Sequence, residues 1–431
     1  MFTNRIRSGS FAGRVVRASK RRLATLLQSA VCGLAILGAA VPARAQISMN
    51  FEQQDLISRR GVTGYSKLLG FDKDQTETAV TLWEGSQSVY RATMKDFQNR
   101  MQEMQNKAQE KGDWTAIQKE LGEISTQMQE KIQASEKQFF DDLKAVCTDE
   151  QASRWESVER YRRREVGMRL PLMSGSAVDL ILVADRQKVG DKAEVKELLS
   201  EYELAIDRPM MLVAKMQDEQ SKRQKELMEK MMANPASGMD EVNKLMGELA
   251  AIGKDIRNVN RDFGRKIAAV LPDDARTRFE DEIARKSFPR VYRESQAAKM
   301  LVAATGLADL SAEQKETLSQ LRKSYASEVK PLNERWSKAI EAQEEKHNGT
   351  MGVMIASQMS MAMGGGEGDE TIKDAKEARD ARKELDERTE KRVNEVLNEA
   401  QRAKLPEKKV EPEMPWMDLV PEEGDETPGA E

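Results

Sequence analysis

The sequence is poor in the residues that enzymes and metal sites use most. Its 431 residues include two cysteines and one histidine, so a zinc site built from cysteine and histidine is not expected. The histidine, His347, has no second ligand at metal-binding spacing, and no candidate nucleophile has a base in view. No glycine-rich loop follows an expected strand. We therefore expect neither catalytic residues nor a bound metal or cofactor.

Aromatic residues are also scarce, at 5% of the chain, whereas charged residues make up 33%. A compact globule needs more large side chains to close its core, so this composition favours long, solvated helices. Only Cys147 lies outside the N-terminal leader described next, so an intramolecular disulfide is excluded from the remaining chain. We expect a buried, unreactive thiol, and stability that comes from helix packing or homo-oligomerisation.

The first 45 residues have the composition of a secretory signal peptide. Residues 1–22 carry seven basic residues and no acidic one, an apolar run continues to Val41, and Ala43-Arg44-Ala45 offers small residues to a signal peptidase. An uncleaved membrane anchor is the alternative, because about 19 apolar residues can just span a bilayer. Cleavage near Ala45 predicts a periplasmic or secreted protein that meets the membrane only through this transient segment.

Cleavage would remove eight basic residues and no acidic one, which changes the net charge from −4 to −12. A chain this acidic is not expected to bind nucleic acid or anionic lipid. The end of the chain, 406–431, is rich in proline, glutamate and glycine and is expected to be a disordered acidic tail. It contains Met414-Pro415-Trp416-Met417, which is either a docking peptide or part of a merely solvated tail.

A five-residue pattern recurs six times between these ends. It consists of an apolar residue, a helix-capping residue, two free positions and glutamine. In such a capping box the cap side chain accepts a hydrogen bond from the first helical turn, and the glutamine bonds back to the cap amide. The full copies are 71–75, 147–151, 310–314 and 397–401, with cap and glutamine residues Asp72, Gln75, Thr148, Gln151, Ser311, Gln314, Asn398 and Gln401.

Two degenerate copies, 189–193 and 271–275, keep the apolar residue and lose the glutamine. The intervals between successive caps alternate between long and short, at 76, 42, 82, 39 and 87 residues. Three tandem units would give this alternation. A shift of 124 residues also superposes five apolar positions of the first unit on five of the second, which favours duplication.

Within each unit, apolar residues recur at spacings of three and four, the period of a helical seam. In the first unit the seam stops at Lys111-Gly112-Asp113 and resumes at Trp114. Two helices joined by so short a turn must run antiparallel. The predicted fold class is all-α, with three tandem long antiparallel helical hairpins of coiled-coil-like packing, linked by short helices, in units 46–168, 169–290 and 291–405.

Methionine is unusually abundant, with 24 residues that crowd the second and third hairpin tips. The second tip is expected at Asn234–Gly238. Three interpretations stay open: core filling, a soft apolar surface for many partners, and Cu(I) coordination by thioethers. The candidate client-binding residues are Met228, Met231, Met232, Met239, Met246, Met351, Met354, Met359, Met361 and Met363.

The six capping boxes, above all 147–151 and 310–314, resemble the LTxxQ motif of the periplasmic Spy and CpxP family, whose members carry two such motifs. The resemblance covers about residues 55–405 and implies three such units in tandem. It also implies ATP-independent chaperoning or envelope-stress sensing, in which a curved helical surface holds unfolded or envelope proteins. The zinc site of related members is not implied, because its histidines are absent. The alternatives are a structural coiled-coil spacer or adaptor of the cell envelope and a Met-based Cu(I)-binding protein.

Overall fold

The computed structural model describes residues 57–111, 114–219, 222–223, 226–227, 230, 234–362 and 369–407. These residues form helices and loops without any strand, so the all-α prediction is confirmed for them. None of the helices in this part of the chain is long and apolar enough to cross a membrane. The predicted signal peptide and the predicted tail beyond Glu407 lie outside the described residues.

The described chain divides into two compact units. The first contains the residues up to Val166 together with Ala214–Gly238, and the second contains Gly167–Val213 and the residues from Met239 onward. The division into three repeats rests on motif spacing rather than on internal contacts, and it stays a prediction.

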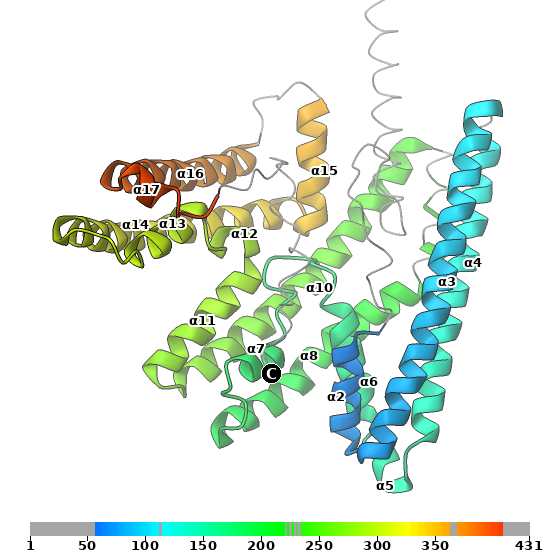
Figure 1. The fold of residues 1–431 in the computed structure, drawn as a ribbon. Helices are drawn as coiled ribbons and strands as arrows, with labels where there is room; N and C mark the ends of the chain where they lie inside the picture. Colours follow the sequence, from blue (N-terminus) through cyan, green and yellow to red (C-terminus); the bar gives the residue numbers. More distant parts are fainter. Residues whose placement is uncertain are drawn as a thin grey trace, which may run out of the picture. The chain divides into compact units, whose positions relative to one another are not determined.

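The first unit packs around a small aromatic cluster. Its helices are α2 (Arg59–Leu69), α3 (Lys73–Lys111), α4 (Trp114–Ala145), α5 (Asp149–Ala152) and α6 (Trp155–Gly167). α3 lies along α4, and α2 packs on α3 (Figure 1). The Tyr65 ring meets Phe140 edge to face at 5.4 Å between centroids, and Phe140 meets Trp155 at 6.5 Å. Aromatic side chains from α2, α4 and α6 therefore meet in one cluster.

A buried glutamine interrupts the apolar seam of α3. Gln87, 3% exposed, donates from Nε2 to Ile57 O at 2.7 Å, and Trp83 Nε1 donates to the same carbonyl at 2.7 Å. A buried polar group with a partner costs little, so the seam tolerates it. Nearby, the buried Tyr65 hydroxyl donates to Glu165 Oε2 at 2.8 Å. Both contacts hold the segment before α3 against the unit.

The second unit contains most of two helices that cross the unit boundary, α8 (Ala193–Asp218) and α10 (Pro235–Ala269). Its other helices are α7 (Leu180–Arg186), α11 (Asp273–Ser287), α12 (Pro289–Tyr292), α13 (Gln296–Thr305), α14 (Ala312–Lys346), α15 (Gly349–Ala362), α16 (Glu370–Val396) and α17 (Glu399–Arg402). α14 lies along α16, and α13 packs on both (Figure 1). Their shared core includes Leu301, Leu318, Tyr325, Leu385, Val393 and Leu397.

The second predicted tip differs from the structure. The sequence predicts a turn at Asn234–Gly238, but α10 already begins at Pro235. Proline fits the first turn of a helix because its missing N–H would have no intrahelical partner there. Gly238 N donates to Asn234 O at 3.0 Å, which is the bond of a first helical turn. These residues therefore start a helix instead of forming a turn.

A buried polar cluster joins α13, α14 and α16. Arg382 donates from Nε to Asn333 Oδ1 and from Nη2 to Tyr325 OH, both at 2.9 Å, and forms an ion pair with Asp386. The hydroxyls of Tyr325 and Ser295 donate to Asp386 Oδ1 at 2.7 and 3.1 Å. Burial raises the pKa of Tyr325 to about 12, so this hydroxyl remains a donor at neutral pH.

Candidate functional site

The capping boxes meet in pairs, and the two glutamines of a pair bond to each other. In the first unit Gln75 and Gln151 exchange two hydrogen bonds, each 2.9 Å from Nε2 to Oε1. Gln75 Nε2 also donates to Val146 O at 3.0 Å, and Gln151 Nε2 donates to Gly70 O at 3.1 Å. Each glutamine thus satisfies a carbonyl beside the other copy. We call this arrangement a glutamine clasp.

The same glutamines cap their own helices. Gln75 Oε1 accepts from Asp72 N at 3.2 Å, and Gln151 Oε1 accepts from Thr148 N at 2.9 Å. In return, Asp72 Oδ1 and Thr148 Oγ1 accept from the glutamine backbone amides at 2.8 and 3.3 Å. Each side-chain amide therefore uses two donor hydrogens and two acceptor positions, which is its full hydrogen-bonding capacity.

The second unit contains a second clasp with the same register. Gln314 and Gln401 exchange bonds of 3.0 and 3.4 Å. Gln314 Nε2 donates to Val396 O at 2.9 Å, and Gln401 Nε2 donates to Asp309 O at 3.0 Å. In both clasps the accepting carbonyl lies two residues before the cap of the opposite copy. The capping residues of this second clasp are Ser311 and Asn398.

The degenerate copies cannot form a clasp, because Ala193 and Ala275 stand at the glutamine positions. Near the end of α10, Arg276 donates from Nε to Ala268 O at 3.0 Å and from Nη2 to Leu271 O at 3.1 Å. Arg402 makes the corresponding bond to Leu397 O at 3.0 Å beside the second clasp. The cap residue of the copy 271–275 is Pro272, which has no backbone N–H and therefore needs no glutamine oxygen as acceptor. The absence of glutamine from both copies is consistent with the reciprocal geometry of a clasp. A single glutamine would have no second glutamine with which to exchange hydrogen bonds.

The methionines proposed to bind clients lie in different surroundings. Met246 of α10 is 3% exposed and lies in the interior. Met351 and Met354 of α15 are half-buried. The other candidates have side chains outside the described residues, namely Met228, Met231, Met232, Met239, Met359, Met361 and Met363. Among the described candidates, only those on α15 reach solvent appreciably.

α15 is an apolar helix that the heptad pattern does not predict. Its fourteen residues contain no charged side chain. Val353 is buried, whereas Met351, Met354 and Ile355 are half-buried. A surface helix normally has a polar face, and apolar residues placed all around a helix give no periodic signal in the sequence. Part of the apolar surface of α15 therefore faces solvent.

The start of α15 is set by a tight turn. Asn348 and Gly349 have φ values of 59° and 86°, the left-handed region that glycine adopts most readily. A Cβ atom on Gly349 would lie 2.6 Å from Leu172 O, which is too close for any side chain. Thr350 N donates to the same carbonyl at 3.1 Å. The loop around Leu172 therefore holds the first turn of α15 in place.

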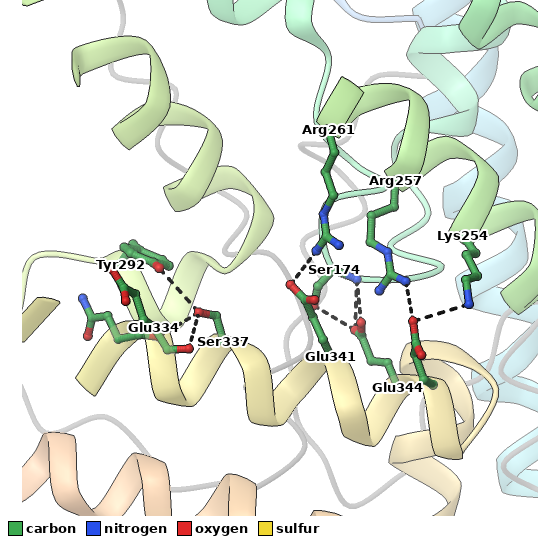
Figure 2. A network of polar contacts seen from close by, with 11 residues as sticks. Ser174, Lys254, Arg257, Arg261, Tyr292, Glu334, Ser337, Glu341 and Glu344 are labelled. Carbon is green, nitrogen blue, oxygen red and sulfur yellow. Dashed lines mark hydrogen bonds and ion pairs between the residues drawn. The ribbon is translucent and has the colours of Figure 1, made fainter. Parts of the chain in front are cut away.

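Beside this turn, α14 carries a buried carboxylate, Glu344, which is 1% exposed. Both of its oxygens accept from Ser174 N at 3.0 Å, and Oε1 also accepts from Ser174 Oγ at 2.8 Å (Figure 2). Thr350 Oγ1 donates to Oε1 at 3.0 Å. Burial raises the pKa of this carboxyl although these hydrogen bonds and the charge of Arg257 oppose the shift. Glu344 thus ties α14 to the loop before α7 and to α15.

Ion pairs between α10 and α14 continue this network (Figure 2). Arg261 meets Glu341 at 2.5 Å, and Arg257 and Lys254 meet Glu345 at 2.8 and 3.5 Å. The Arg257 side chain is 2% exposed and that of Glu345 is 50% exposed, so this pair reaches from the interior to the surface. The hydrogen bond from Arg257 holds the pKa of Glu345 below its usual range. Neighbouring glutamates therefore have pKa values shifted in opposite directions.

We expect Glu344→Gln and Glu345→Gln to change the pH dependence of stability in opposite ways. With a raised pKa, Glu344 contributes stability that is present below the unfolded value of about 4.3 and is lost as the pH rises through its folded value. With a lowered pKa, Glu345 contributes stability that is present above about 4.3 and is lost as the pH falls through its folded value.

Hydrogen exchange of α14 amides, compared between variants at equal pH, measures this difference. Between pH 7 and 4.5 the stability of wild type relative to Glu344→Gln should rise as the pH falls. The stability of the wild type relative to Glu345→Gln should fall only below this pH range, where Glu345 becomes protonated. If the difference in stability between the wild type and Glu344→Gln does not vary with pH, the raised pKa assigned to Glu344 is wrong.

The only histidine lies in an ion cluster between helix ends. His347 Nε2 lies 2.6 Å from Asp369 Oδ2, and Lys346 Nζ donates to Asp369 Oδ1 at 2.9 Å. Thr371 N donates to the same oxygen at 3.0 Å, so Asp369 is also the N-cap of α16. Burial alone would raise the pKa of Asp369, but the bonds from Thr371 and Lys346 and the charge of His347 hold it well below its usual range. The cluster connects the two ends of the segment that carries α15.

Other chemically interesting groups have ordinary surroundings. Cys147 is half-buried rather than fully buried, and its Sγ donates to Leu143 O at 3.6 Å. Burial raises the pKa of this thiol, which keeps it protonated at neutral pH. A surface hollow on the last helices presents only charged and amide side chains, from Glu387, Glu390, Lys391, Asn394, Glu395 and Arg402. Over the residues that the structure describes, no group of three or more His, Cys, Asp or Glu side chains could hold a metal ion.

No family model, no curated protein and no solved structure matches this chain. The resemblance to the Spy and CpxP family therefore depends on the motif copies and stays a hypothesis.

Sequence reasoning located the capping residues and missed the network around Glu344. In the run Glu341-Ala342-Gln343-Glu344-Glu345-Lys346 a buried glutamate looks like its solvated neighbours. The heptad period does not distinguish the buried glutamate, because glutamate occupies three of these six positions. The available signal was the small-residue loop Ser174-Gly175-Ser176, in which Ser174 donates from both its backbone amide and its hydroxyl to Glu344.

Proposed function

We propose that this chain is an exported, non-enzymatic helical binding protein that holds unfolded clients, in the manner of a Spy- or CpxP-like periplasmic chaperone. The observation that carries the proposal is α15, a helix of fourteen residues without a charge in a chain that is 33% charged. Its half-buried Met351 and Met354 supply flexible, polarisable contacts that adapt to different apolar partners.

The proposed architecture is three tandem antiparallel hairpins with coiled-coil-like packing. The lengthwise contacts of α3 with α4 and of α14 with α16 support it. So do the two clasps, because each joins the start of an outgoing helix to the end of the returning one. The middle hairpin, without a clasp, would be held by its apolar seam and by side chains such as Arg276.

The proposed location is the periplasm or the exterior, reached through the signal peptide predicted in residues 1–45. The proposed partners are unfolded or envelope proteins, without nucleic acid, and the protein acts alone or as a homo-oligomer. The net charge of −12 expected after cleavage supports this choice, since it disfavours polyanions. It also keeps a chaperone with exposed apolar surface soluble.

The mature chain, residues 46–431, is expected to suppress the aggregation of a chemically unfolded model protein at a near-stoichiometric ratio. Light scattering at low and high salt measures this, and an apolar binding surface predicts suppression that survives high salt. Absence of suppression at several-fold excess would overturn the proposal. A copper titration of the same chain tests the thioether alternative separately.

Replacing both Met351 and Met354 by serine is expected to raise the ratio of chain to client needed for suppression by about threefold to tenfold, because two half-buried thioethers no longer contribute apolar contact. The matched control replaces Met101 and Met216, which are half-buried on α3 and α8, by serine. Equal weakening in both double variants would show that α15 is not the binding surface.

A further inference from the structure

The two described methionines of α15 lie on a helix that is attached to the second unit mainly along one side and at one end. Met351 and Met354 are half-buried and three residues apart, on a helix without a charged side chain. α15 packs chiefly on α14, and the bonds from Thr350 to Leu172 O and to Glu344 hold its first turn. A helix with few tertiary contacts opens locally at a low cost in free energy, so small solutes in water reach both sulfur atoms.

These thioethers react differently from the thiol of Cys147. A thiol reacts readily only after it has ionised, and burial raises the pKa of Cys147, which keeps this thiol protonated at neutral pH. A thioether has no proton to lose, so its oxidation depends on whether the reagent reaches the sulfur. An oxidant is therefore expected to modify the accessible thioethers before this thiol.

We propose that Met351 and Met354 form a modification site for two-electron oxidants of the hypochlorous acid class, which convert both thioethers to sulfoxides. Each sulfur gains one oxygen atom and loses two electrons. These electrons reduce the chlorine of hypochlorous acid to chloride, and the proton of the acid is released. The product is a polar, chiral side chain that a methionine sulfoxide reductase converts back to methionine, so the modification is reversible.

The modification changes the surface of α15 without removing what holds the helix in place. The left-handed turn at Asn348 and Gly349 and the hydrogen bonds of Thr350 involve no sulfur atom. A sulfoxide oxygen accepts hydrogen bonds, so burying it against an apolar client without a donor costs free energy. The consequence rests on the proposed function: oxidation of α15 releases clients, and reduction restores the holding activity.

Oxidation rates in the mature chain test the site without reference to clients. Under limiting hypochlorous acid, peptide mass mapping is expected to show sulfoxide forming at Met351 and Met354 about tenfold faster than at Met246 and Met210, which are 3% and 0% exposed. Met211, which follows Met210 and is 48% exposed, is the positive control. Equal rates at the α15 methionines and at the two buried methionines would overturn the proposal.

Replacing both Met351 and Met354 by leucine tests the consequence, because leucine keeps the apolar volume and removes both sulfur atoms. The same dose of oxidant is expected to raise the ratio of chain to client needed for suppression by about threefold to tenfold in the wild type and to leave the double variant unchanged. Equal losses in both chains would assign the effect to other residues and overturn the proposal. A wild type that holds no client before oxidation would refute the proposed function and the release of clients with it, whereas the oxidation rates still decide whether α15 is the modification site.

Discussion

Replacing Gln401 by alanine is expected to lower the local free energy of unfolding of α14 and α16 by about 2 to 3 kcal/mol, because polar groups lose their partners away from water. The side chain is 1% exposed and takes part in hydrogen bonds with Asn398 N, Asp309 O and both polar atoms of the Gln314 amide. Hydrogen exchange measures this local free energy without requiring the whole chain to unfold in one step.

The matched control for this variant is Gln320→Ala on α14. Gln320 is exposed and bonds only to Glu316, at 2.7 Å, so its loss should change stability by no more than about 0.5 kcal/mol. Combining Gln314→Ala with Gln401→Ala should cost about 1 kcal/mol less than the sum of the two, because both changes break the same bonds. A Gln401→Ala effect as small as the control would show that the clasp does not stabilise the fold.

Arg382→Met is expected to destabilise α13, α14 and α16 by about 3 to 5 kcal/mol, the cost of leaving one member of a buried ion pair alone. The side chains of Arg382 and Asp386 are 7% and 18% exposed. Without the guanidinium, Asn333 Oδ1 also loses a donor. The thermal midpoint should fall, and the α16 amides should lose protection and exchange faster.

The control for Arg382→Met lies two turns further along α16. Arg388 pairs with Glu328 at 2.8 Å, but their side chains are 55% and 46% exposed, so Arg388→Met should cost less than about 1 kcal/mol. Adding Asp386→Leu to Arg382→Met should recover part of the loss, because no buried charge then lacks a partner. Equal effects of Arg382→Met and Arg388→Met would contradict the structural role given to the cluster.

Helix starts were the most predictable part of the fold. A capping box joins residues only three apart, so Thr148 with Gln151 and Ser311 with Gln314 could be recognised without any tertiary information. The clasps could not be derived in this way. The bond between Gln75 and Gln151 joins residues 76 apart, and a cap pattern does not say which distant helix end its glutamine reaches.

α15 shows where periodicity fails as a predictor. A heptad seam appears in the sequence only when one face of a helix is buried and the other is solvated. Gly349–Ala362 carries no charged residue to mark a solvated face, so its pattern could not be separated from a methionine-rich loop. The hairpin tip predicted at Pro235 was wrong for a related reason. Proline is common both in loops between helices and in the first turn of a helix, where α10 has it.

The methionine content could be read from the sequence, but the exposure of each methionine could not. The abundance of methionine left core filling, a soft apolar surface and Cu(I) coordination open, and in the structure Met246 is buried while Met351 and Met354 are half-buried. Exposure depends on what packs against each helix. The exposure of Leu204 and Met211 has the same origin, because they belong to α8, a helix whose other face is buried through Tyr202 and Met210.

By itself the sequence determined the all-helical class and the positions of the capped helix starts, because capping and heptad spacing are interactions between near neighbours along the chain. Only the tertiary structure decided that the glutamines bond in pairs, that Glu344 is buried against Ser174, and that Arg382 bonds to Asn333 and Tyr325 of α14. The free energy of a buried polar group depends on hydrogen-bond partners that are far away in the sequence. The residues next to a glutamate or an arginine do not show whether such partners will be present.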